Sequence, residues 1–139
     1  MKEAIPSTFK LKEFYIKESK FILSKKGVPL NLNIKLNPKG TVIKAENTFI
    51  LEIDVEIDER EEAVNISVKC IATYQFQQDL EDGLPTSYFI TNAPAIAFPY
   101  IRAYISTLTS QSGFTTITLP VMNLAPQAEH LRKNITIIE

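Results

Sequence analysis

The chain has 139 residues, of which 45% are hydrophobic and 22% charged, and its formal net charge is −1. This composition is typical of a globular protein, and the near-zero charge excludes the basic surface that nucleic-acid binding requires. The single cysteine, Cys70, excludes an internal disulfide, and no run approaches the roughly 20 apolar residues of a membrane span. With no apolar signal segment at the N-terminus, the sequence predicts one cytoplasmic domain, residues 1–139, without membrane insertion.

The first predicted strand covers residues 8–23. Its apolar residues change parity, because Phe9 and Leu11 occupy odd positions whereas Phe14 occupies an even one. One extra residue in a strand turns every later side chain to the other face. We therefore expect a bulge near Lys12, which keeps the apolar residues on one face.

The second predicted strand covers residues 30–36, where apolar residues take every second place. This period of two is typical of a strand with one buried face. The following Asn37-Pro38-Lys39-Gly40 is a strong turn signal and predicts that the strand ends there.

The third and fourth predicted strands, residues 48–57 and 63–76, are joined by a short charged turn. Two alternating runs at this spacing predict an antiparallel hairpin. The third strand directs Glu52, Asp54 and Glu56 away from its apolar face. These carboxylates have no histidine among them, so a solvated face is a better interpretation than a metal site.

Two helices are predicted after the strands, over residues 98–112 and 126–134. Prolines suit the first turn of each, and Gly113 is placed to end the first. The first helix has an apolar stripe for packing on the sheet and a face of small uncharged residues, which predicts close contact with another helix or subunit. The order of elements predicts an α+β fold, a four-stranded antiparallel sheet with both helices on one face.

Enzymatic chemistry is not indicated. The only histidine, His130, lies in the last helix, and Cys70 falls on the buried face of a strand, where it behaves as a small apolar residue. The four glycines are isolated, so no phosphate-binding loop is present. The sequence predicts no catalytic residue, cofactor or metal.

The segment Phe98-Pro99-Tyr100-Ile101-Arg102, followed by Gly113-Phe114 and by Ile117-Thr118-Leu119-Pro120-Val121-Met122-Asn123-Leu124, resembles the signature of the bacterial protein-export chaperone SecB. The strands before it fit the same family, so the resemblance covers nearly the whole chain. It implies a SecB-like homotetramer, a dimer of dimers, acting as an ATP-independent holdase for unfolded or pre-secretory polypeptides.

The resemblance also nominates the residues that bind client polypeptide. They come from the first helix, the segment after it and, less directly, the fourth strand: Tyr100, Tyr104, Phe114, Ile117, Leu119, Val121, Met122, Leu124, Tyr74 and Phe76. Arg102, alone in an apolar helix, is expected to bind a carbonyl or an acidic group of the protein rather than a client. Ile101 and Ile105 are expected in the core.

Family members are usually acidic and often have an acidic tail that helps recruit the translocase motor SecA. This chain is nearly neutral and its last residues are Ile135-Thr136-Ile137-Ile138-Glu139, so Glu52, Asp54 and Glu56 remain as the candidate motor-docking face. Two other functions stay open: a dedicated chaperone of one partner, such as an antitoxin, and a scaffolding oligomer without chaperone activity.

Overall fold

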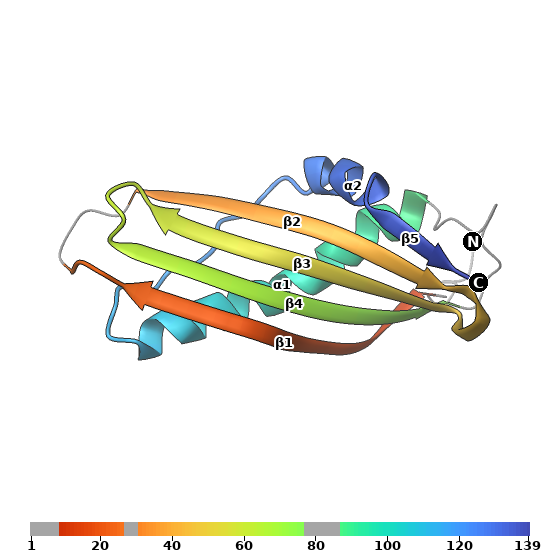
Figure 1. Cartoon of the computed structure of the whole chain (residues 1–139), viewed down its shortest axis with the longest axis horizontal. Helices are drawn as coiled ribbons and strands as arrows, with labels where there is room; N and C mark the ends of the chain where they lie inside the picture. Colours follow the sequence, from red (N-terminus) through yellow and green to blue (C-terminus); the bar gives the residue numbers. More distant parts are fainter. Residues whose placement is uncertain (1–8, 27–30, 77–86) are drawn as a thin grey trace, which may run out of the picture.

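The computed structural model describes residues 9–26, 31–76 and 87–139. A single sheet carries two α-helices on one face, and a 3₁₀ turn, Lys44–Glu46, joins two of its strands (Figure 1). The elements in chain order are β1 (Phe9–Leu23), β2 (Leu32–Ile43), β3 (Thr48–Glu59), β4 (Val64–Phe76), α1 (Ser87–Gln111), α2 (Ala125–Arg132) and β5 (Ile135–Ile138).

The described sheet has five strands in the order β1-β4-β3-β2-β5, so the prediction of four strands is wrong by one. The first four are antiparallel, as predicted, whereas β5 pairs in parallel with the end of β2. The extra strand comes from the region expected to end the last helix. Its Ile-Thr-Ile-Ile sequence favours extended backbone, and α2 stops earlier, at Arg132.

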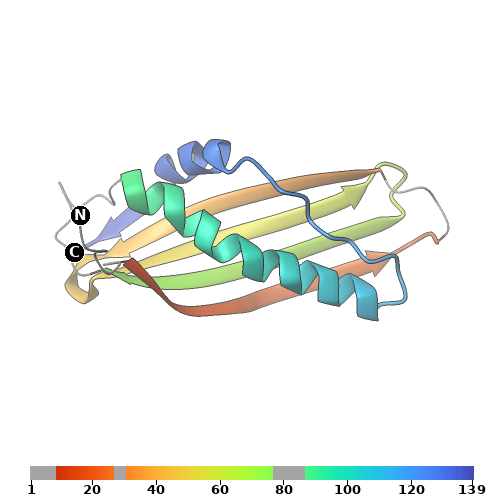
Figure 2. The same ribbon diagram turned by 180° about the vertical axis from the view of Figure 1, so that it is seen from behind.

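Alternation along β3 and β4 creates an inner face, which the helices cover, and an outer face (Figure 2). The inner-face residues of β3 are almost completely buried: Phe49, Leu51, Ile53, Val55 and Ile57. Ile101 and Ile105 of α1 pack on them as expected, each no more than 1% exposed. Burial of such side chains is the main stabilising contribution, about 1.5–3 kcal/mol for each large one.

β1 keeps its apolar residues on the inner face by means of two bulges. One lies between Leu11 and Glu13, where the sequence predicts it, and a second lies between Ile16 and Glu18. Together they bring Phe21 opposite Ile66 of β4 on the inner face. The second bulge restores the original parity and was not predicted.

β2 does not end at residue 36 but continues through the predicted turn to Ile43. Pro38 is tolerated because its backbone nitrogen points away from β3. On that side no hydrogen bond to β3 is lost when the N–H is missing. Gly40 is required for packing rather than for a turn: an added Cβ would lie 2.6 Å from the Phe49 ring. The reversal occurs instead at Asn47, which adopts a left-handed conformation with φ of 50°.

α1 begins at Ser87, earlier than the predicted start near residue 98, and runs through both Pro94 and Pro99. Each proline removes one helical hydrogen bond, a cost that burial of the helix against the sheet offsets. The helix ends where predicted, and Gly113 follows with φ of 83°. No helix in the described part of the chain is long and apolar enough to cross a membrane.

The hairpin between β3 and β4 is held by a buried carboxylate. Glu59, which is 3% exposed, accepts hydrogen bonds from the backbone N–H groups of Glu61 at 2.8 Å and Ala63 at 3.3 Å. Burial raises the pKa of this carboxyl, but the N–H donors, which also include Asn31 and Arg60, outweigh that effect, and the pKa of Glu59 is lowered.

A lowered folded-state pKa means that Glu59 stabilises the fold above its ordinary pKa of 4.5 and that this contribution is lost as the pH falls below it. We expect Glu59→Gln to lower the urea midpoint at neutral pH and to approach the wild type as the solution is acidified. Urea unfolding across that range checks this. A difference independent of pH would show that packing, rather than charge, is the role of Glu59.

Candidate functional site

The segment between the two helices, residues 112–124, is called here the crossover segment. It leaves the end of α1, runs back along the inner face beside the helix and joins α2 (Figure 2). α2 contacts both α1 and β2. The inner face is thus covered by α1, the crossover segment and α2.

Polar side chains of α1 bind the crossover segment of the same chain. Arg102 donates from Nε to the carbonyl of Leu119 at 2.9 Å and from Nη2 to that of Pro120 at 3.1 Å. The Ser106 hydroxyl donates to the Ile117 carbonyl at 3.2 Å. The prediction that Arg102 binds a carbonyl is confirmed, and the small polar residues Ser106 and Thr109 bind backbone groups of the chain's own crossover segment.

Thr109 is the innermost of these groups and is fully buried. Its hydroxyl donates to the Ile105 carbonyl at 2.8 Å and accepts the N–H of Ile117 at 2.8 Å. The hydroxyl therefore satisfies a helix carbonyl and fixes the register of the crossover segment with a single atom. Neither role can be taken over by an aliphatic side chain of the same shape.

We expect Thr109→Val to destabilise the protein by about 1–3 kcal/mol, because the Ile117 N–H is left buried without an acceptor. Hydrogen exchange of the Ile117 amide should accelerate more than that of the β3 core. Ser106→Ala is the matched control, since its hydroxyl binds a carbonyl that is less buried and leaves no N–H orphaned. Equal effects of the two changes would contradict this role for Thr109.

Four of the residues nominated for client binding are buried within the protein: Ile117 (3% exposed), Leu119 (1%), Tyr74 (0%) and Phe76 (3%). The Tyr74 hydroxyl donates to the Ala93 carbonyl of α1. Burial, and secondarily the nearby Tyr100, raise the pKa of Tyr74. In this conformation these four side chains belong to the core and are closed to a client.

The other nominated residues lie on two sides of α1. Tyr100 is 50% exposed and stacks on Phe14 of β1, with ring centroids 5.3 Å apart. Phe114 meets Phe21 of β1 edge-on at 6.3 Å, and Tyr104 is partly buried against the core. The structure therefore places Tyr100 and Phe114 on the β1 side of the helix.

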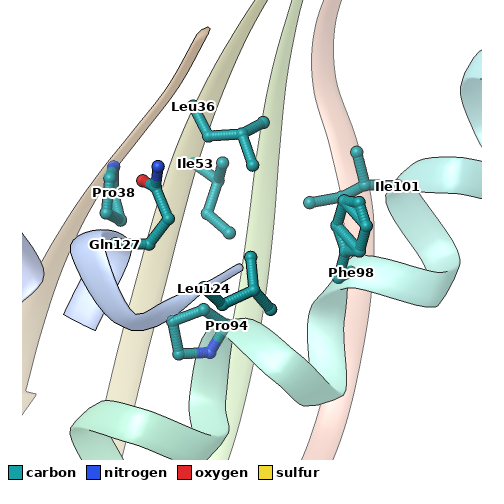
Figure 3. Close-up of a pocket in the computed structure, with 8 residues that line it drawn as sticks. All are labelled: Leu36, Pro38, Ile53, Pro94, Phe98, Ile101, Leu124 and Gln127. Carbon is teal, nitrogen blue, oxygen red and sulfur yellow. The ribbon is translucent and has the colours of Figure 1, made fainter. Parts of the chain in front are cut away.

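Val121, Met122 and Leu124 lie at the other end of the crossover segment, next to α2. Val121 is 92% exposed, while Met122 and Leu124 are half-buried against the core. Leu124 reaches an apolar pocket between α1, α2 and the sheet (Figure 3). The nominated residues thus lie in two groups, and Leu124 of the second group lines this pocket.

The pocket is narrow, with a cavity volume of about 10 Å³, room for roughly one water molecule. Its lining comes from β2, β3, α1, the end of the crossover segment and α2: Leu36, Pro38, Ile53, Pro94, Phe98, Ile101, Leu124 and Gln127. The Oε1 atom of Gln127 is buried and has no hydrogen-bond partner among the described residues. An unpaired acceptor in an apolar site favours a ligand that brings a donor.

Most of the pocket lining was absent from the sequence-based prediction. Leu36 and Pro38 were assigned to the end of a strand and to a turn, and Gln127 to an unremarkable helix. For Leu36, the alternation of apolar residues along its strand does indicate that the side chain faces inward. Nothing local to residue 127 indicates that its side chain reaches β2, since that contact depends on how α2 docks.

The predicted acidic face lies on the outer side of β3, and its charges are partly balanced there. Glu52 forms an ion pair with Lys39 at 3.4 Å, and Glu56 accepts a hydrogen bond from Ser67 at 3.0 Å. Asp54 lies directly opposite Lys69 of β4. The three carboxylates therefore face side chains of the neighbouring strands and also form part of the outer surface of the sheet.

No group of three or more metal-binding side chains occurs in the described ranges. Cys70 is 2% exposed on the inner face, and its pKa is raised to about 12, first by burial and then by the charge of Asp54. His130 lies exposed on α2. The thiol is therefore protonated and enclosed, as expected of a small apolar residue in a core.

A sequence model of the family described as "Preprotein translocase subunit SecB" matches residues 2–127. A protein of Methanocaldococcus jannaschii, described as uncharacterized, is 28% identical over 131 residues, which cover 88% of this chain and 84% of that protein. A solved structure of a Mycobacterium tuberculosis SecB-like chaperone, in complex with a peptide from an antitoxin, matches with a TM-score of 0.70 at 16% identity. It covers 84% of this chain and 91% of that one, and it shows that the fold is shared. Because the family match spans nearly the whole chain and agrees with this fold, the protein belongs to the SecB family.

Proposed function

We propose that the protein is an ATP-independent chaperone, a holdase that binds unfolded polypeptide. The observation that carries this proposal is the apolar pocket between α1, α2 and the sheet, which Leu124 of the crossover segment lines, together with the exposed Val121 and the half-buried Met122 that precede Leu124 in the chain. Membership of the SecB family supports it. So does the structural relative, a SecB-like chaperone that holds a peptide.

A holdase has to accept many sequences, so its contacts are best made by apolar area rather than by a fixed set of hydrogen bonds. Val121 and the flexible Met122 offer such area, and Leu124 leads from them into the pocket. Each apolar anchor of a client contributes about 1.5–3 kcal/mol when buried. Several weak anchors along one unfolded chain then add up through multivalency.

The aromatic group beside β1, Tyr100, Tyr104 and Phe114, has two uses within this proposal. It is either a second client-contact region or part of the subunit interface of a homotetramer. Tyr100→Asp separates them: loss of client binding by an intact oligomer favours the first, and dissociation measured by light scattering favours the second. Ile117, Leu119, Tyr74 and Phe76 enter client contact only if the crossover segment moves.

The test of the proposal is direct. Purified protein is mixed with reduced, carboxymethylated α-lactalbumin, a permanently unfolded chain, and complex formation is followed by fluorescence anisotropy. Suppression of luciferase aggregation on heating is measured in parallel, without nucleotide. We expect both binding and suppression. Absence of both, with the oligomer intact, would leave the scaffolding function as the better account.

A dedicated chaperone of one partner is the second candidate, and two observations favour it. The structural relative is bound to a peptide from an antitoxin, and the charges of Glu52, Asp54 and Glu56 are partly balanced by neighbouring side chains. Tight binding of one neighbour-encoded protein without binding of α-lactalbumin would support this candidate. An export role through SecA, in the cytoplasm, predicts instead that Glu56→Lys weakens SecA binding.

A further inference from the structure

One polar side chain enters the apolar pocket between α1, α2 and the sheet. Seven of the eight lining residues are apolar, and the eighth is Gln127 of α2. Its Oε1 atom is buried and has no hydrogen-bond partner among the described residues. Figure 3 shows the amide of Gln127 beside Pro38 of β2. A buried acceptor that stays unpaired is unfavourable, so this atom calls for an explanation.

The neighbouring backbone of β2 explains why Oε1 is unpaired. Gly40 donates its N–H to the carbonyl of Asn134, on the side of β2 away from β3. Pro38 lies two residues earlier in the same unbroken register, so its nitrogen faces the same side. Proline has no N–H, and β2 therefore offers Gln127 no donor at this position. Since an aliphatic side chain at position 127 could fill the same space without a polar atom, packing alone does not account for the glutamine.

The space beside Gln127 has the size of one small polar group. The cavity volume of about 10 Å³ is room for roughly one water molecule. A buried water usually makes about two to four hydrogen bonds, whereas this lining offers a single polar side chain. A water held in this way is weakly bound. A ligand group that donates to Oε1 can therefore replace it with a gain in affinity.

We propose that Gln127 is a specificity-determining residue for clients, and that its Oε1 accepts a hydrogen bond from the hydroxyl of a client threonine or serine. This inference rests on the proposed function and names the client residue that the pocket takes. Threonine has nearly the shape of valine, so its methyl group contacts the apolar lining while its hydroxyl takes the place of the water. Valine displaces the same water but leaves Oε1 buried and unpaired.

Other donors fit the pocket less well. A lysine ammonium would lose its hydration without a carboxylate to pair with, since the lining residues carry no charge. The side-chain amide of asparagine or glutamine would bring a second acceptor, for which the lining has no further donor side chain. A hydroxyl is small, neutral and able to donate to one acceptor. Size, charge and hydrogen-bonding capacity thus agree on a hydroxyl.

The first experiment combines one substitution in the protein with one in the client. Fluorescein-labelled peptides carry several leucine and valine anchors, and one valine after another is replaced by threonine. Each peptide is titrated against wild type, Gln127→Met and His130→Met by fluorescence anisotropy. Methionine has about the length of glutamine but no strong acceptor. His130→Met is the matched control, because it places the same side chain at an exposed position of α2 that does not line the pocket.

We expect one peptide position at which wild type binds threonine at least as tightly as valine. There Gln127→Met should lower the threonine-to-valine affinity ratio by about tenfold or more, because the hydroxyl is then buried without a partner. With His130→Met the same ratio should stay within about twofold of wild type, as for independent sites. A ratio that Gln127→Met leaves unchanged at every position overturns the inference.

The second experiment observes the Gln127 side chain directly by NMR in protein labelled with ¹³C and ¹⁵N. Its carbonyl resonance, assigned by its loss in Gln127→Met, should shift on binding of the threonine peptide by more than on binding of the valine peptide. Equal shifts overturn the hydrogen bond to Oε1.

Melting curves separate recognition from a structural role. Gln127→Met should melt at or above the wild-type temperature, because it removes an unpaired buried acceptor. A lower melting temperature with an unchanged threonine-to-valine ratio would show that Gln127 holds α2 in place instead. If α-lactalbumin binds and no peptide shows the change in ratio, this inference alone fails. If neither the peptides nor α-lactalbumin bind wild-type protein, the proposed function fails and this inference fails with it.

Discussion

Leu124→Asp is expected to weaken client binding strongly while preserving the fold. Leu124 lines the apolar pocket and is the N-cap residue of α2, where its side chain makes no capping hydrogen bond. Aspartate is among the best N-cap residues and suits the positive end of a helix, so α2 should be at least as stable as before. In the pocket, however, the new carboxylate lies near the unpaired oxygen of Gln127 and repels apolar client side chains.

We expect the affinity for unfolded α-lactalbumin to fall by about tenfold to a hundredfold, which corresponds to about 1.4–2.8 kcal/mol. Ala125→Asp is the matched control: it adds the same charge one residue further on, at an exposed position of the same helix. Anisotropy titrations and melting curves of both variants provide the comparison. If Ala125→Asp binds as weakly as Leu124→Asp, net charge rather than the pocket is responsible.

Gly40→Ala is expected to cause the largest loss of stability among single-methyl changes on β2. The new Cβ would lie 2.6 and 2.7 Å from two atoms of the Phe49 ring and 3.3 Å from a methyl group of Leu131. Phe49 is fully buried in the centre of the core, so the ring has no free space into which to move. Overpacking of this kind costs about 1–3 kcal/mol and should lower the melting temperature by roughly 3–12 °C.

Two controls identify the cause of the Gly40 effect. Phe49→Leu in the Gly40→Ala background should recover part of the loss, because it removes the atoms that clash. Gly113→Ala should also destabilise, but by backbone strain alone, since its φ is 83° and nothing lies within 4 Å of an added Cβ. Asparagine at position 113 should relieve that strain. Additive effects of the two changes at positions 40 and 49 would contradict a direct clash.

The inner faces of the strands were predictable because side-chain direction in a strand has a period of two. The buried residues of β3 and β4, the hairpin between them and the bulge at Lys12 all follow from that alternation. The helical stripe with Ile101 and Ile105 follows in the same way from a period near 3.6. The motif from Phe98 to Leu124 indicates the SecB family from the sequence alone, and the family match agrees with it.

Hydrogen-bond partners were less predictable, because alternation says nothing about what lies beside a strand. Pro38 and Gly40 indicate a turn locally, yet Pro38 occupies an edge position and Gly40 makes room for Phe49. The parallel pairing of β5 with β2 could not be predicted from the alternation for the same reason. It depends on the turn after α2, which brings Asn134 against Gly40.

The sequence by itself determined which side chains face the core and to which family the chain belongs, since periodicity and motif are local properties. Only the tertiary structure decided which of the nominated side chains are open to a client. Ile117 and Leu119 look like exposed groove residues in the motif, but Thr109 and Arg102 bind the backbone beside them and turn both side chains inward. The pocket at Leu124 likewise forms where α1, α2 and the sheet meet. Its formation depends on contacts between segments that are distant in the sequence.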